Sequence, residues 1–281
     1  MSSDIHEVDV LEKIAGAMTQ EISGLQWRPS RWLAKRGAVC GRRYRLGLAC
    51  RGGFGWLTCH GLAPADPHRL WEITSTLAGP SRLVQSPHAA TAHLEATWPW
   101  RLLPPDAQTA LLVSDLQWLL GRMEHPAASV TDDLGERLRG ALATSGDIVE
   151  LPAAADCWEV RVGRGRGTIQ VSFRRPRAQA ITASTFVTNW TADGYREEQA
   201  AARLAAMMNG RLRWVRLVLR DTAINAEVTL PARALSEQTW APARDALVQA
   251  AKSCRAALRL VQCPAVAAEF LRLYPFGESQ G

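Results

Sequence analysis

Apolar and polar residues follow their clearest pattern in the C-terminal part of the chain. Residues 195–208 carry apolar positions at intervals of three to four, and Asn209-Gly210 follows as a typical helix C-cap, so a short helix is predicted. Residues 213–220 and 224–230 alternate with a period of two, which predicts two strands joined by a tight turn. From 236 to 261 the apolar residues again recur at helical spacing. The predicted order is therefore helix, hairpin and long helix.

The residues immediately before this stretch predict a helix followed by three strands. A helix is predicted to begin after the N-cap residue Thr131 and to end near Ser145-Gly146, with leucines on its apolar face. The segment 148–162 is extended, 169–174 alternates with a period of two, and 181–187 is a third predicted strand.

The first half of the chain shows a similar succession in a weaker form. It predicts a helix at 8–22, three antiparallel strands between 25 and 62, a helix at 64–77, two strands within 83–100 and a helix from 104. The two halves share negligible residue identity, but both read helix, three strands, helix, two strands, helix. This order predicts an α+β fold of two tandem antiparallel-sheet modules, residues 1–126 and 127–281, with helices on one face of each sheet. A short tail helix is expected after Pro264.

The composition is that of a folded globular protein. Of the 281 residues, 47% are hydrophobic and 21% are charged, as in ordinary domains. No apolar run approaches the ~18–20 residues of a membrane-spanning helix, and the acidic N-terminus does not resemble a signal peptide. The six cysteines form no CxxC pair and are expected to be reduced. We expect a cytoplasmic bacterial protein.

The net charge of +6 is unevenly distributed. Residues 22–65 contain no acidic residue but eight basic ones, interleaved with aromatic residues, so this stretch could bind nucleic acid through phosphate contacts and base stacking. Only three of the 33 basic residues are lysines, which suggests a GC-rich genome and favours the simpler interpretation of a solvated polar sheet face. The residues predicted for an anion or nucleic-acid patch are Arg42, Arg43, Arg45, Arg164 and Arg166.

Several of the eleven tryptophans are candidates for a partner-binding surface. Most tryptophans are expected in the core, but four lie in less regular segments, and one lies on the more polar side of the predicted strand 213–220. Exposed aromatic side chains are enriched in protein interfaces. The predicted partner-binding residues are Trp27, Trp32, Trp98, Trp100 and Trp214.

Catalytic and metal-binding motifs are not found in the sequence. The glycine-rich run at 163–167 is followed by a predicted strand rather than by the helix that a phosphate-binding loop needs. The six histidines show no known metal spacing, and there is no GxSxG nucleophile motif. The carboxylates that begin helices are explained by capping. We therefore expect no enzymatic activity, no metal and no cofactor.

The second half resembles the class I type III secretion chaperones and the similar YbjN-like domains. The resemblance lies in the helix 199–210, the hairpin 212–230, the Leu230-Pro231 stop and the closing helix 236–261, and it covers about residues 131–262. The first half resembles these families only in element order. The resemblance implies a non-enzymatic protein that binds an extended polypeptide over apolar grooves and sheet edges, commonly as a homodimer. This chain departs from the pattern because secretion chaperones are usually small and acidic, whereas its sequence pI is about 9.3.

Two functions follow as hypotheses. The first is a protein-binding, chaperone-like module in which the tandem copies imitate the family's dimer within one chain, with a homodimer also possible. The alternative is a nucleic-acid-binding protein that uses the basic, aromatic-rich sheet at 22–65. The sequence does not name the partner or the pathway.

Overall fold

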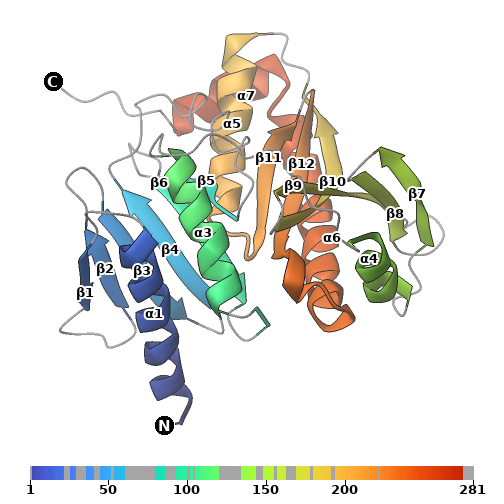
Figure 1. Cartoon of the computed structure of the whole chain (residues 1–281). Coiled ribbons are helices and arrows are strands. Elements are labelled where there is room, and N and C mark those ends of the chain that lie inside the picture. Colours follow the sequence, from blue (N-terminus) through green and yellow to red (C-terminus); the bar gives the residue numbers. More distant parts are fainter. Residues whose placement is uncertain are drawn as a thin grey trace, which may run out of the picture.

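Two antiparallel sheets and their helices form the protein in this computed structural model (Figure 1). The structure describes residues 2–21, 26–29, 36–40, 45–51, 54–60, 80–85, 93–99, 102–103, 105–119, 134–143, 148–154, 157–162, 169–177, 180–190, 194–220 and 222–274. None of the helices in these ranges is long and apolar enough to cross a membrane.

The N-terminal half contains the first sheet. Its elements are α1 (Ser2–Glu21), β1 (Gln26–Pro29), β2 (Arg36–Cys40), β3 (Arg45–Arg51), β4 (Phe54–His60), β5 (Arg82–Val84), β6 (His93–Pro99) and α3 (Pro105–Leu119). The strands are ordered β1-β2-β3-β4-β6-β5 and all pair antiparallel. α1 contacts β1, β2 and β3 on one face of this sheet, and α3 packs beside α1 (Figure 1).

The C-terminal half contains the second sheet. Its elements are α4 (Leu134–Ala143), β7 (Ile148–Ala154), β8 (Cys157–Val162), β9 (Ile169–Arg177), β10 (Ala180–Asn189), α5 (Tyr195–Asn209), β11 (Val215–Arg220), β12 (Ala223–Pro231), η2 (Ala232–Ala234), α6 (Glu237–Leu260) and α7 (Pro264–Leu273). The order β7-β8-β9-β10-β12-β11 is the same succession as in the first sheet. α6 covers β10 and β12 on one face.

The α+β prediction is confirmed, but the predicted number of strands is wrong. Four strands, not three, precede the hairpin strands of each sheet. In the second half the segment 148–162 is a hairpin of β7 and β8 rather than one strand, and its register shifts between Glu150 and Ala154. Short strands of four to seven residues show too few alternations to be separated by periodicity. The helix predicted at 64–77 lies outside the described residues.

Local sequence explains where the longest helix begins. Ser236 and Thr239 form a capping box, in which the Ser236 Oγ accepts a hydrogen bond from the Thr239 amide and the Thr239 Oγ1 accepts one from the Ser236 amide. One turn later Trp240 is fully buried, with its ring centroid 4.8 Å from that of Phe173 in β9. The capping box therefore fixes the register in which α6 presents its apolar side to the sheet.

A single hydrophobic cluster runs through both halves. It includes Leu11 and Ile14 of α1, Leu57 of β4, Val228 of β12 and Leu247 of α6, all at most 3% exposed. Burial of apolar side chains is the main favourable term in folding. The two halves are therefore stabilised by one shared core.

The two sheets meet at β5 and β11, each of which is the last strand of its sheet. Arg82 in β5 donates from Nη1 to the Val215 carbonyl (2.8 Å), and Arg216 in β11 donates from Nη1 to the Ser81 carbonyl (2.8 Å). The two contacts are reciprocal, because each arginine reaches the carbonyl that immediately precedes the other arginine. All four residues are buried.

Each of these arginines is also paired with a glutamate directly opposite it on the neighbouring strand. Arg82 lies 2.7 Å from Glu95 of β6, and Arg216 lies 3.0 Å from Glu227 of β12. Arg220 adds a second ion pair to Glu227, at 2.8 Å. Buried charges need such partners, because an unpaired charge in the protein interior is strongly unfavourable.

The C-terminal end of α5 forms hydrogen bonds with backbone groups of both edge strands. The Asn209 amide donates from Nδ2 to the Leu83 carbonyl (3.1 Å) and the Leu217 carbonyl (3.3 Å), and its Oδ1 accepts from the Leu217 amide (2.7 Å). The Gln85 amide donates to the Ala206 carbonyl. Because unpaired buried backbone groups are costly, these bonds allow two sheet edges to lie buried against each other.

Arg82→Ala should destabilise the fold far more than removal of an exposed arginine. The substitution leaves Glu95 buried without its guanidinium, and breaking a buried ion pair from one side typically costs about 3–5 kcal/mol. Urea unfolding followed by circular dichroism measures the change. The matched control is Arg272→Ala, which breaks an exposed pair with Glu269 and should leave the unfolding free energy almost unchanged. Equal effects of the two substitutions would contradict a structural role for the junction.

The junction should also make stability depend on pH on the acid side. Burial alone raises the pKa of Glu95, but the interaction with the His93 imidazole, 3.9 Å away, and the charge and hydrogen bond of Arg82 outweigh it and lower the pKa of Glu95 below its ordinary value. A lowered carboxyl pKa contributes stability above the unfolded-state pKa of about 4.3, and this contribution is lost as the pH falls through the folded-state value. Glu95→Gln should therefore be less stable than the parent at pH 7. Urea unfolding should show the difference shrinking below about pH 4, whereas a constant difference would contradict the assignment.

Candidate functional site

A polar pocket lies where the end of β10 meets the end of α6. Arg255 of α6 holds these two elements together by donating from Nε to the Val187 carbonyl (3.0 Å) and from Nη2 to the Phe186 carbonyl (3.3 Å). The register of β10 against β12 shifts between Phe186 and Thr188. Such a bulge redirects the side chains that follow it. The last residues of β10 are thus placed beside the last turn of α6.

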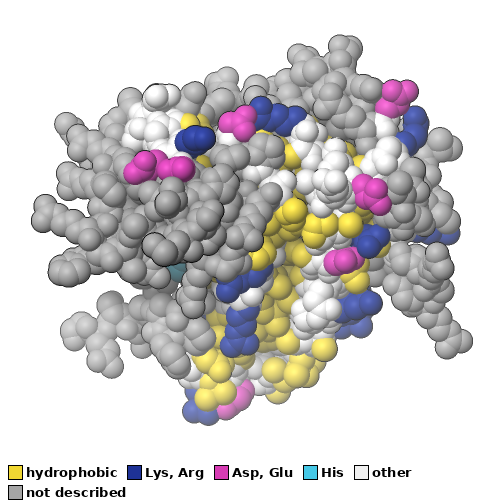
Figure 2. Space-filling view, turned by 90° about the horizontal axis from the view of Figure 1, so that it is seen from below, with side chains coloured by type: hydrophobic (Ala, Val, Ile, Leu, Met, Phe, Trp, Pro, Cys, Tyr) yellow, Lys and Arg dark blue, Asp and Glu magenta, His cyan; other side chains and the backbone are white. Residues whose placement is uncertain are grey.

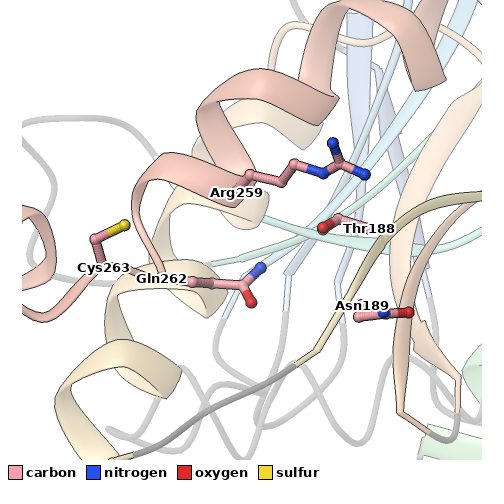
Figure 3. Close-up of a pocket in the computed structure, with 5 residues that line it drawn as sticks. All are labelled: Thr188, Asn189, Arg259, Gln262 and Cys263. Carbon is pink, nitrogen blue, oxygen red and sulfur yellow. The ribbon is translucent and has the colours of Figure 1, made fainter.

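Five side chains line the pocket, which has a volume of about 340 Å³. They are Thr188 and Asn189 from β10, Arg259 from α6, and Gln262 and Cys263 from the turn that leads into α7. Arg259 and Gln262 extend towards the two β10 residues (Figure 3). Gln262 donates from Nε2 to the Leu258 carbonyl (3.0 Å), which anchors its carboxamide to the helix end.

The lining of the pocket offers several polar groups that can form hydrogen bonds. It provides one guanidinium, two carboxamides, one hydroxyl and one thiol. These groups can hold a carboxylate or the amide groups of a peptide, because guanidinium and carboxamide groups donate hydrogen bonds in planar arrays. The five lining residues include neither a carboxylate nor an imidazole, so they contain no general acid–base pair. Among the described residues no three histidine, cysteine, aspartate or glutamate side chains are placed to hold a metal ion.

Large apolar side chains are exposed on the elements that meet at this end. Phe186, Tyr195, Leu260 and Leu273 are 42–64% exposed. They belong to β10, the start of α5, the end of α6 and the end of α7, which come together at the upper end of the molecule (Figure 1). Exposed apolar groups beside polar ones are typical of protein-binding surfaces.

Two of the tryptophans predicted to bind a partner are instead core residues. Trp98 is 1% exposed, and it packs so closely on Gly55 that a Cβ atom there would lie 2.4 Å from the indole ring. Trp214 is 6% exposed. Its φ of 67° puts it outside the regular alternation of β11, which begins only at Val215, so the expected polar side of the strand does not apply to it. The prediction of exposed aromatic anchors is wrong for these two residues.

The structure describes the other predicted site residues only in part or not at all. Trp27 lies in β1, and Arg45 lies in β3 opposite Cys40 and His60, but their side chains are outside the described part of the structure. The remaining predicted residues lie outside the described residues altogether: Trp32, Trp100, Arg42, Arg43, Arg164 and Arg166.

Sequence reasoning did not find the pocket. Arg259 and Gln262 are three residues apart at the end of a helix, where an arginine is usually explained by the helix dipole. Asn189 is the last residue of a strand about 70 positions earlier, so no local pattern joins it to them. Only the packing of α6 on β10 brings the three side chains together.

Comparison with known proteins assigns no family. No protein-family model matches the chain, and no curated protein matches it in sequence. Among solved structures, an aspartate kinase from Synechocystis is aligned with 10% identity and a TM-score of 0.17. The alignment covers 90% of this chain and 46% of the kinase chain, so the present chain spans about half the length of that protein. Such a score does not indicate a common fold.

Proposed function

We propose that this protein is a cytoplasmic, non-enzymatic module that binds an extended polypeptide, as the resemblance to chaperone-like domains implies. The observation that carries the proposal is the contrast between the inner and outer sheet edges. The inner edges, β5 and β11, are closed by Arg82, Arg216 and Asn209. The outer edges, β1 and β7, each have one neighbouring strand among the described strands. An added strand would therefore pair with β1 or β7, since edge strands are templates for strand addition.

The polar pocket supplies a second contact for such a partner. Arg259, Asn189 and Gln262 can bind an acidic side chain or the peptide groups of the partner. Exposed apolar side chains on the neighbouring elements would bind its apolar residues. Seen from below, the described surface also carries a band of hydrophobic side chains with lysine and arginine on either side (Figure 2). Apolar surface of this kind supports binding of a partner with alternating apolar and acidic residues.

The proposal includes a tandem, pseudo-dimeric organisation of the two halves. Three observations support it: the common strand order, the common register of each arginine with its glutamate, and the reciprocal arginine–carbonyl contacts. A two-fold interface has the same property, because residue i contacts j and j contacts i.

A chain cut between its halves should remain assembled. A protease site inserted after Ala128, close to the predicted boundary between the two modules, allows cleavage of the purified protein. We expect the two pieces to co-elute on size exclusion after cleavage, because the shared core and the junction do not depend on the chain being continuous at this boundary. Arg216→Glu should weaken this association, since it places two carboxylates beside each other at Glu227. Separation of the unmodified pieces under native conditions would contradict the pseudo-dimer.

Peptide binding can be tested with a displayed library of random extended peptides. We expect the selected peptides to be bound at least about tenfold more weakly by Arg259→Glu. Arg139→Glu in α4 makes the same charge change at an exposed site and should change affinity less than about twofold. Fluorescence anisotropy of a labelled peptide measures both.

Hydrogen exchange locates the bound peptide. Amides of β1 or β7 should gain protection on binding, while the Leu217 and Gln85 amides should be slow already in the free protein because they are hydrogen-bonded at the junction. Failure to select any peptide, or new protection confined to β5 and β11, would overturn the proposed function.

A further inference from the structure

We propose that the polar pocket between β10 and α6 binds the free C-terminal carboxylate of the partner polypeptide, an inference that rests on the proposed peptide-binding function. The pocket has a volume of about 340 Å³. A water molecule takes up about 30 Å³, so the pocket can hold a carboxylate together with the peptide group that precedes it. The five lining residues carry one positive charge, on Arg259, and no negative charge.

The hydroxyl of Thr188 is the observation that points to a ligand. Thr188 is only 4% exposed, yet its hydroxyl lies in the wall of the pocket and points towards Gln262 (Figure 3). This hydroxyl forms no hydrogen bond with any residue that the structure describes. Buried polar groups in proteins are nearly always hydrogen-bonded, because an unpaired one costs free energy. A polar group of a ligand in the pocket would provide the partner.

The guanidinium of Arg259 is also without an ion pair or a hydrogen bond within the described part of the chain. An arginine in the last turn of a helix often binds the carbonyls that end that helix. In α6 this explanation does not hold, because the carbonyls of residues 257–260 already accept hydrogen bonds from donors in the segment 261–263. The guanidinium instead extends towards Thr188 (Figure 3). It is therefore free to bind an anion there.

The start of α7 adds partial positive charge beside the same pocket. Cys263, which lines the pocket, is the N-cap residue of this ten-residue helix, and its side chain makes no capping hydrogen bond. Pro264 follows at the first helical position. The amides of a helix N-terminus favour a negative charge nearby. The helix end thus acts in the same direction as Arg259.

A single carboxylate fits this lining better than a phosphate group does. A guanidinium binds a carboxylate through two parallel hydrogen bonds, and one positive side chain balances its single negative charge. A phosphate group carries about −1.5 to −2 at pH 7, which the lining does not match. The carboxamides of Asn189 and Gln262 offer both donors and acceptors, as a peptide group requires.

A terminal carboxylate also fits better than the side chain of an acidic residue. One carbon separates the terminal carboxylate from the nitrogen of the last peptide group, whereas two or three carbons separate the carboxylate of an aspartate or glutamate side chain from it. Only the terminal group therefore brings a charge and a peptide group together within one small pocket. The guanidinium would bind the charge, and the carboxamides would bind the peptide group.

Selection from two displayed peptide libraries tests this site on the full-length protein. In one library the random peptides end in a free carboxylate, and in the other they are blocked by fusion at the C-terminus. Selected peptides are then synthesised with an N-terminal fluorescein, both as the C-terminal acid and as the C-terminal amide. Anisotropy should show the amide bound at least about tenfold more weakly, because it lacks the charge that Arg259 binds.

Three variants assign this difference to the pocket. Arg259→Gln should weaken binding of the acid at least about tenfold and leave the amide almost unchanged, so that the two forms bind alike. Thr188→Val should weaken binding of the acid at least about threefold. It should not lower the urea-unfolding free energy, since the lost hydroxyl has no partner in the described structure. Arg139→Gln makes the same charge change at an exposed position of α4 and should alter affinity less than about twofold.

Equal binding of the acid and amide forms, or equal weakening of both by Arg259→Gln, would overturn the inference. An amide peptide ending in glutamate that binds as tightly as the acid would also overturn it and would identify a side-chain carboxylate as the ligand. Displacement of the acid by inorganic phosphate at lower concentration than by acetate would count against it in the same way.

The two libraries separate this inference from the proposed strand addition. Peptides obtained only from the blocked library, with new protection of β1 or β7, would overturn the carboxylate site and leave strand addition intact. Acid-selective binding that is lost in Arg259→Gln, without protection of either edge strand, would support the carboxylate site and overturn strand addition. Failure of both libraries would overturn both.

Discussion

The reciprocal contact between Arg82 and Arg216 is the constraint on which the arrangement of the two halves depends. Each half ends its sheet with an edge strand, and an edge strand buried without partners would leave main-chain groups unpaired. The two edges do not complete one continuous sheet. Instead, the side chains of Arg82, Arg216 and Asn209 form hydrogen bonds with main-chain groups of these edges. The arginines can be buried because each has a glutamate opposite it on the next strand.

This arrangement leaves a short signal in the sequence. Arg82-Leu83-Val84 and Arg216-Leu217-Val218 occupy the two edge strands. The neighbouring strands share the spacing Glu-x-Thr-x-Pro, at Glu95–Pro99 and Glu227–Pro231. The expectation of negligible identity between the halves is therefore wrong at the junction. These few residues are alike because each edge strand buries a guanidinium that donates to a main-chain carbonyl and needs a glutamate beside it.

The match between the halves is not complete. The Trp214 amide donates a hydrogen bond to the Thr97 Oγ1 (2.9 Å). In the first half the corresponding position, two residues before Arg82, is Pro80, which has no amide hydrogen to donate. Thr229 instead lies 3.4 Å from the hydroxyl of Thr182.

The sequence by itself determined the α+β class and most elements of the C-terminal half, such as the hairpin of β11 and β12 and the helix α6. Periodicity and capping are local properties, and Ser236 or Asn209-Gly210 can be recognised without any tertiary contact. Tertiary structure decided the rest. The Arg82–Val215 bond joins residues 133 positions apart, the pocket joins β10 to α6, and the burial of Trp98 and Trp214 depends on the backbone around them. Contacts between distant segments produce no periodic pattern of apolar and polar residues in the sequence, because the packing of whole helices and strands determines which residues meet.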